Sequence, residues 1–177
     1  MCLRLARERP ERIASLTIVD SSTAASGDNV FRGPLLADAP RPFRTRESIA
    51  WVTSRFSYSD AHLTDAWMSA RAAIAATEKN EEAVRNFPRT LEPSLNAQKA
   101  DTLGWIADGH MSTPTMLVWG KNDPSAVLPR GLELFDLIST SVPRSSIHIF
   151  NRAGHYCYRE HPEAFVAMVT AFIKSQA

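Results

Sequence analysis

The chain has 177 residues and a mass of 19.6 kDa, which suits about one ordinary domain. A hydrophobic fraction of 44% and a charged fraction of 22% exclude intrinsic disorder, and a net charge of +1 provides no basic field for a nucleic acid. No apolar run approaches the roughly 20 residues of a membrane span, and residues 1–14 lack the apolar core of a signal peptide. Two cysteines, Cys2 and Cys157, make no disulfide framework, so we expect a reducing, cytoplasmic location.

The first predicted strand lies near the N-terminus. Residues 1–26 read as the end of a helix, a strand and a turn, with the β-branched run at residues 15–20 as the strand. This strand is apolar on both faces, which is typical of a central strand in a parallel sheet.

The middle of the chain, residues 27–110, is predicted to be helical. Residues 46–56, 60–77 and 81–87 have helix-like patterns, and the segment is punctuated by Pro34, Pro40, Pro42, Pro88 and Pro93. A helical block between the strands of an α/β sheet is either a set of crossover helices or an inserted cap. Eighty-odd residues exceed the needs of one crossover, so the length favours a cap.

Residues 111–177 read as strand, helix, strand, helix. The strands are expected at residues 115–120 and 146–150, with a helix at residues 131–139 between them. A final helix begins at Pro162 and places apolar side chains on one face at helical spacing: Phe165, Met168, Val169, Phe172 and Ile173. Strands that alternate with helices predict an α/β fold with a parallel sheet.

Two polar side chains follow consecutive predicted strands. Asp123 lies in the loop after the strand at residues 115–120, and His155 follows Gly154 shortly after the next strand. The two residues are 32 positions apart, which leaves room for one helix and one strand, so both loops should emerge at the carboxyl edge of the sheet. A carboxylate there can accept the Nδ1–H of the histidine and fix its tautomer. The plainer readings are an aspartate that caps the next helix and a histidine on a surface loop.

These motifs resemble the C-terminal part of an α/β-hydrolase. The strand followed by Trp119-Gly120-x-x-Asp123, the Gly154-His155 pair and the final amphipathic helix match that family, and so does Leu3-x-Leu5-Ala6-x-x-x-Pro10-Glu11-Arg12-Ile13 before the first strand. The family's chain order is Ser, then the acid, then His. The resemblance implies that His155 is the general base and that Asp123 orients it.

The family's nucleophile motif, G-x-S-x-G, occurs nowhere in the 177 residues. Alignment by Pro10 places that motif upstream of Met1. We therefore expect the chain to be a fragment or an N-terminally truncated gene product that supplies the last three strands and is inactive alone. The first strand would then be an exposed edge.

Within the family, the helical segment resembles the cap of hydrolases that cleave carbon–carbon bonds in meta-cleavage products of aromatic catabolism. The stretch Leu63-Thr64-Asp65 with Arg71 resembles the cap helix that carries the substrate-carboxylate arginine, and a bidentate guanidinium suits a dienoate carboxylate. Arg71 could equally be a solvated helix residue. Those enzymes commonly have Trp after the catalytic histidine, and Tyr156 stands there in this chain, where it would alter the wall of the substrate pocket.

Several other residues have competing interpretations. Asp20 is a rival acid, because some members of this fold carry the acid after the earlier strand; otherwise it is a turn residue. His155, Cys157 and His161 lack a convincing fourth ligand, so we expect no metal, and the resemblance implies no organic cofactor. Cys2 has no oriented base near it and is not expected to be a nucleophile.

The sequence thus predicts a hydrolase of a small vinylogous diketo acid, with ester hydrolysis as the alternative. The predicted division is a core of residues 1–26 and 111–177 and a cap of residues 27–110. A non-catalytic protein that pairs its open strand edge with another chain, including a second copy, is the other class of function. No nucleic-acid or membrane partner is expected.

Overall fold

The computed structural model describes residues 2–27 and 34–176 of the chain. Three parallel strands form one sheet in the order β1-β2-β3: β1 (Leu16–Val19), β2 (Thr115–Gly120) and β3 (Ser145–Phe150). Leu16 is opposite Thr115 in the register of β1 and β2, and Gly120 is opposite Phe150 in that of β2 and β3. The predicted α/β architecture with three parallel strands is confirmed.

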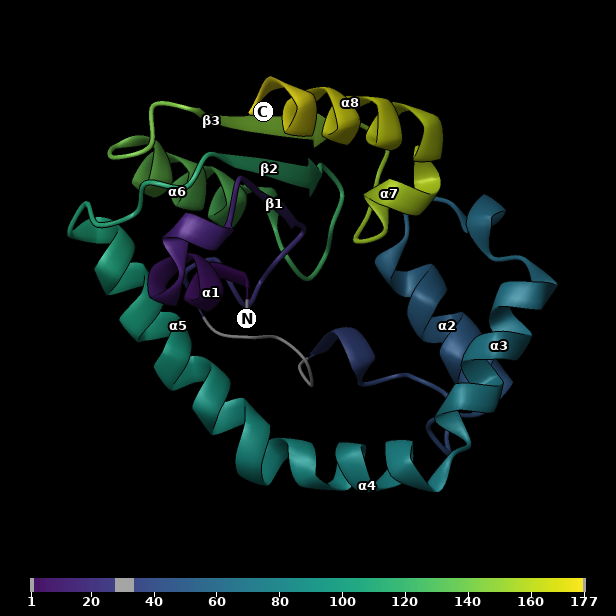
Figure 1. Ribbon diagram of the computed structural model, residues 1–177. Coiled ribbons are helices and arrows are strands. Elements are labelled where there is room, and N and C mark those ends of the chain that lie inside the picture. The colour runs from purple at the N-terminus through teal and green to yellow at the C-terminus, as the bar shows by residue number, and fades with distance from the viewer. Residues whose placement is uncertain (1, 28–33, 177) are drawn as a thin grey trace.

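The central strand β2 is buried throughout because its alternate residues face different helices. Leu117 and Trp119 point to the face covered by α1 (Cys2–Glu8), α5 (Glu92–Ala107) and α6 (Leu128–Ser139). Met116 and Val118 point to the opposite face, where α8 (Pro162–Ser175) lies. Figure 1 shows α8 on one side of the sheet and α6 with α1 on the other. The apolar stripe expected on the final helix indeed packs on the sheet, through Phe165, Met168, Val169 and Phe172.

The predicted strand at residues 15–20 is an edge strand within the described part of the chain. Leu16 and Ile18 are each 7% exposed and pack into the core, whereas Thr17 and Val19 are half-buried. A hollow of about 240 Å³ runs beside β1 and α1 and is bounded on its far side by α5. The apolar edge that the sequence leads us to expect is therefore present.

The regular elements described between β1 and β2 are all helices or helical turns, joined by turns and irregular stretches. This segment contains α2 (Arg46–Phe56), α3 (Asp65–Ala75), α4 (Glu78–Asn86) and α5, with short 3-10 turns at Pro34–Leu36 and Asp60–His62. In Figure 1, α5 and α4 sweep away from the sheet, and α3 and α2 lie beyond the carboxyl ends of the strands, near α7 (Cys157–Glu160). Residues 28–33 of the predicted cap lie outside the described part.

Two details of the predicted helices differ in the structure. The expected helix at residues 60–77 is divided, because Thr64 begins a new helix by accepting the N–H of Trp67 with its side chain. The helix expected at residues 81–87 ends at Asn86 as α4 (Glu78–Asn86), but the chain continues directly into further helical structure rather than into a loop. A π-helical turn, Phe87–Leu91, connects α4 to α5; Pro88 lies in this turn and Pro93 in the first turn of α5. Proline has no N–H to donate, so neither residue contributes a donor to the helical hydrogen bonds.

Candidate active site

The carboxyl ends of all three strands carry polar groups to one edge of the sheet. Asp20 follows β1 directly, Asp123 lies three residues after β2, and His155 lies five residues after β3. Parallel strands place their carboxyl ends together, which is where sites form in open α/β sheets. The site therefore draws on three segments that are far apart in the sequence.

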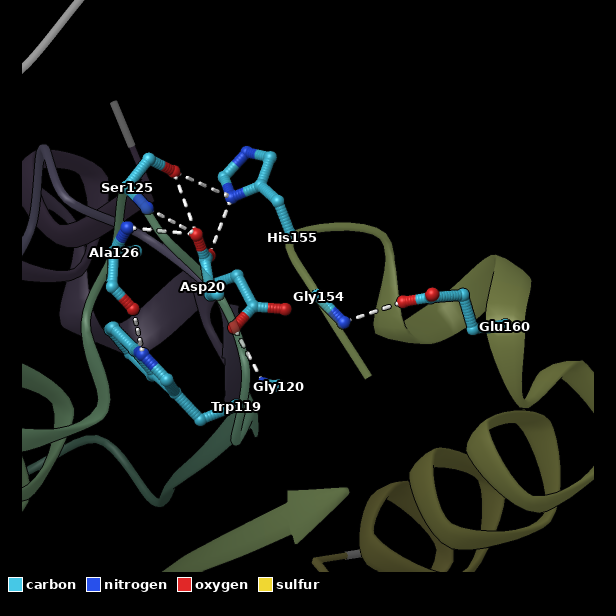
Figure 2. Close-up of polar contacts among 9 residues, drawn as sticks. Asp20, Trp119, Gly120, Ser125, Ala126, Gly154, His155 and Glu160 are labelled. Carbon is cyan, nitrogen blue, oxygen red and sulfur yellow. Dashed lines mark hydrogen bonds and ion pairs between the residues drawn. The ribbon is translucent and has the colours of Figure 1, made fainter. Parts of the chain in front are cut away.

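The predicted acid and histidine are in contact. Asp123 Oδ2 accepts the Nδ1–H of His155 at 2.7 Å, and the second ring nitrogen, Nε2, points away from the carboxylate (Figure 2). The Asp123 side chain is fully buried, whereas the His155 side chain is 35% exposed. This geometry lets the imidazole exchange a proton through Nε2 while the carboxylate holds Nδ1–H.

The other oxygen of Asp123 is held by its own loop. Oδ1 accepts the N–H of Ser125 at 2.7 Å, the hydroxyl of Ser125 at 2.8 Å and the N–H of Ala126 at 3.0 Å. The plainer reading, an aspartate that caps the next helix, is not realised: Val127 is the N-cap of α6, which has no side-chain cap hydrogen bond, and Oδ1 of Asp123 closes the turn before that helix instead. Sequence reasoning missed Ser125, although a serine two residues after an aspartate in a loop is a recognisable turn signal.

The two groups shift each other's pKa in opposite directions. Burial alone would raise the pKa of Asp123, but the hydrogen bond and charge of His155, together with the bonds from Ser125, outweigh it and lower that pKa. Burial alone would lower the pKa of His155, but the hydrogen bond and charge of Asp123, aided by the charge of Asp20, raise it. The arrangement favours the ion pair, which is the state that a triad histidine reaches after it accepts a proton.

Backbone contact between two loops brings this pair together. Asn122 N–H donates to Ala153 C=O at 2.8 Å, and Lys121 N–H donates to Phe150 C=O at 2.9 Å. Gly120 leaves no space between the loops, since a Cβ there would lie 2.1 Å from the carbonyl oxygen of Gly154. The glycine before the acid loop is therefore a condition for the contact between Asp123 and His155.

Asp20, the rival acid, lies beside the pair without bonding to His155 among the described residues. It is 2% exposed and has φ 39°, and its Oδ1 accepts the N–H of Gly120 at 2.7 Å. Oδ2 is buried and has no well-formed hydrogen bond in the described part of the chain. Burial raises the pKa of Asp20 from its ordinary value of 3.8 to about 7, and the Cys157 thiol and the Gly120 N–H offset the shift only in part. A thiol is a weak donor.

The raised pKa of Asp20 predicts that the stability contributed by this residue is lost between about pH 4 and pH 7. In this range the folded protein holds a proton that the unfolded chain releases, so the free energy of unfolding falls as pH rises through about 7. Asp20→Asn keeps an acceptor for Gly120 and removes the titration. In urea unfolding, the free energy of unfolding of the variant relative to that of the parent protein should be higher at pH 8 than at pH 5, by roughly a few kcal/mol. An equal change in the free energy of unfolding of both proteins between the two pH values would contradict this prediction.

The two predicted substrate-binding residues lie at different distances from the pair. Tyr156 adjoins His155, and its ring contacts the imidazole edge-on with centroids 5.5 Å apart. Arg71 is exposed, and its guanidinium lies 4.8 Å from the centroid of the Trp67 ring. A series of ring contacts links the two regions, since His62 contacts both Trp67 and Tyr156. Arg71 thus flanks the site through aromatic neighbours rather than touching the Asp123–His155 pair.

Neither a metal cluster nor a membrane-spanning helix occurs in the described ranges. In residues 2–27 and 34–176 there is no group of three His, Cys, Asp or Glu side chains arranged to hold a metal ion. Among the helices of the same ranges, none combines the length and apolar character that crossing a membrane requires.

The profile of the alpha/beta hydrolase family matches residues 2–168. The chain belongs to that family, as its strand order and the loops after β2 and β3 also indicate.

Curated relatives are named as hydrolases of dienoates. The chain is 30% identical over 127 residues to a 2-hydroxy-6-oxononadienedioate/2-hydroxy-6-oxononatrienedioate hydrolase of Cupriavidus pinatubonensis, covering 72% of this chain and 41% of the relative. It is 28% identical to the hydrolase of the same name from Klebsiella pneumoniae, covering 93% of this chain and 55% of the relative. The chain spans about half the length of the curated relatives it matches.

Solved structures show the same fold. The meta-cleavage product hydrolase CumD of Pseudomonas fluorescens superposes with a TM-score of 0.77 at 19% identity, over 99% of this chain and 61% of that one. The 2-hydroxy-6-oxo-6-phenylhexa-2,4-dienoate hydrolase of a Rhodococcus strain gives 0.71 at 18% identity, over 98% and 59%. The recognition of an α/β-hydrolase that resembles meta-cleavage product hydrolases is thus confirmed.

Proposed function

We propose that this chain supplies the acid–base half of a hydrolase that cleaves a carbon–carbon bond in a 2-hydroxy-6-oxo-dienoate. The observation that carries the proposal is the 2.7 Å contact of buried Asp123 with His155 at the carboxyl edge of the sheet. The names of the relatives support the substrate class.

His155 is proposed as the general acid and base and Asp123 as the residue that orients it. Hydrolysis consumes one water: the carbonyl carbon takes the hydroxyl, and the dienoate fragment takes the proton. Nε2 of His155 would move that proton, while the Nδ1–H bond to Asp123 stabilises the imidazolium. A serine nucleophile outside these 177 residues would complete the triad, because the sequence contains no G-x-S-x-G.

The helical segment at residues 27–110 is proposed as a cap over the substrate. Arg71 would bind the substrate carboxylate, and Tyr156 would form part of the pocket wall next to the imidazole. The placement of α2 and α3 beyond the carboxyl ends of the strands supports this role.

The test is complementation. The 177-residue chain alone is expected to show negligible turnover, because loss of the serine of a comparable triad costs about 10⁶ in kcat. Adding the part of the Klebsiella hydrolase that this chain does not match, fused or as a second chain, should restore consumption of a dienoate substrate, followed by its absorbance. A His155→Ala version of the same fusion is the control. A folded, soluble fusion that hydrolyses neither the dienoate nor a p-nitrophenyl ester would refute the proposal; ester cleavage alone would favour the esterase alternative.

A non-catalytic role is favoured by one observation, the open edge of β1 with the hollow beside it. Pairing with another strand would cover that edge, and a second copy of the chain is the simplest partner. Size-exclusion chromatography discriminates between these alternatives. A defined dimer that loses its association when a proline replaces Thr17 would support pairing through β1, whereas a monomer would exclude self-association.

A further inference from the structure

Glu160, at the end of α7, binds the main chain with both of its carboxylate oxygens. Oε2 accepts the N–H of Gly154 at 2.6 Å, as Figure 2 shows, and Oε1 accepts the N–H groups of Tyr58 at 2.7 Å and Ser59 at 2.9 Å. Hydrogen bonds from N–H groups to a charged carboxylate are about twice as strong as neutral ones. The carboxylate therefore joins two separate segments of the chain.

Both segments act on His155. Gly154 directly precedes the histidine, and Tyr58 and Ser59 follow Phe56, whose carbonyl accepts the N–H of His155 at 2.8 Å. Gly154 is in backbone contact with the end of α2, since a Cβ on it would lie 2.3 Å from the carbonyl oxygen of Phe56. The backbone at His155 is thus held from two directions: by Glu160 of α7 and by the end of α2.

Arg159 makes a second tie between α7 and the turn after α2. Its Nε donates to His62 Nδ1 at 3.1 Å, and its Nη2 donates to the His62 carbonyl at 2.9 Å. Because Nδ1 of His62 accepts from Arg159 and the Ser57 hydroxyl donates to Thr53 C=O, the ring proton lies on Nε2, which donates to Ser57 Oγ at 2.9 Å. Burial, reinforced by the charge of Arg159, lowers the pKa of His62. The turn at residues 57–62 therefore cannot move as a unit without disturbing α7.

We propose that Glu160 is a positioning residue that fixes the His155 imidazole against Asp123 and couples it to the turn between α2 and α3. Because of this coupling, the orientation of the His155 side chain depends on the position of α2 and α3. This inference rests on the proposed function only for its catalytic meaning, because the geometry of His155 is measurable in the absence of turnover.

The test is an NMR titration of His155 in the full chain, with Glu160→Gln, Glu160→Ala and Glu163→Gln. Glu163 is exposed in the first turn of α8, and its variant removes the same charge. The charges that raise the pKa of His155 are those of Asp123 and Asp20, so removing the Glu160 charge has little direct effect on it. A lower pKa would therefore report a changed contact with Asp123.

We expect Glu163→Gln to leave His155 unchanged and both Glu160 variants to lower its pKa, by about one in the alanine variant, since a neighbouring carboxylate shifts a pKa by roughly 1–3. The amide protons of Gly154, Tyr58, Ser59 and His155 should lose exchange protection together. Loss of protection at Tyr58 and Ser59 with an unchanged His155 pKa would overturn the proposal and leave Glu160 a purely structural residue. If the alanine variant does not fold, the isosteric glutamine variant decides.

The titration and the complementation assay test this inference and the proposed function separately. Failure of the complemented enzyme to turn over a substrate would refute the function and leave the titration result intact. An unchanged His155 in an active enzyme would refute the coupling alone.

Discussion

Asp123→Asn is expected to hold His155 in the wrong tautomer. Three donors converge on Oδ1, namely Ser125 N–H, the Ser125 hydroxyl and Ala126 N–H, so the amide oxygen of the introduced asparagine must occupy that position. The amide NH2 then faces His155 and donates to Nδ1, which forces the proton of the neutral ring onto Nε2. A base that must accept a proton at Nε2 is then already protonated there.

Two measurements should show the effect of this substitution. In the 177-residue chain, ¹⁵N shifts of the ring should change from the Nδ1–H to the Nε2–H pattern, and the pKa of His155 should fall because the charge and hydrogen bond that raise it are gone. In a complemented enzyme, kcat should fall by about 10⁴, as for the equivalent change in a serine protease. Asp136→Asn, an exposed change on α6, is the control. An Asp123→Asn protein that keeps Nδ1–H and full activity would remove Asp123 from the proposed mechanism.

Replacing Gly120 by Ala is expected to cause a large loss of stability. The new Cβ would lie 2.1 Å from Gly154 O and 2.8 Å from Ala153 O, and both atoms are backbone, so no side-chain rotation relieves the contact. The loops after β2 and β3 must separate, which breaks the bond from Asn122 N–H to Ala153 C=O. Overpacking of this kind costs about 3 kcal/mol, and more where the backbone must move.

Gly104→Ala is the matched control, because a Cβ at this site in α5 meets nothing within 4 Å. It is expected to stabilise the protein by about 1 kcal/mol through helix propensity. Urea unfolding at one pH compares the two variants, with the slope checked for two-state behaviour. If both unfold at the same denaturant concentration as the parent protein, the two loops are not in the close contact described for Gly120.

Asp20 and Glu160 stabilise the same site from opposite sides. Asp20 lies beneath the acid loop and holds Gly120, the residue at which the loops after β2 and β3 meet. Glu160 lies on the far side and holds Gly154. Hydrogen bonds to two glycines thus fix the loop carrying Asp123 and the loop carrying His155, and substitutions at these four positions should not be additive.

The sequence by itself determined the elements and the chemical pair. Short apolar, β-branched runs predicted all three strands to within a residue or two, and the spacing of apolar residues predicted the final helix. Asp123 and His155 were identifiable because parallel strands must present their following loops at one edge, whatever the side chains. Helix boundaries near prolines were not predictable from the sequence, since the π-helical turn at Phe87–Leu91 depends on which backbone hydrogen bonds form around the prolines.

Only the tertiary structure decided how the site is held. In the sequence Asp20 is either a rival acid or a turn residue, and its raised pKa arises from burial between strands that are about 100 residues apart. Glu160 looks like one of many surface carboxylates, and its partners are backbone N–H groups, which every residue except proline possesses and which no sequence pattern distinguishes. Strand and helix periodicity records which face is buried, whereas desolvation and contacts with distant main-chain groups exist only once the chain has folded.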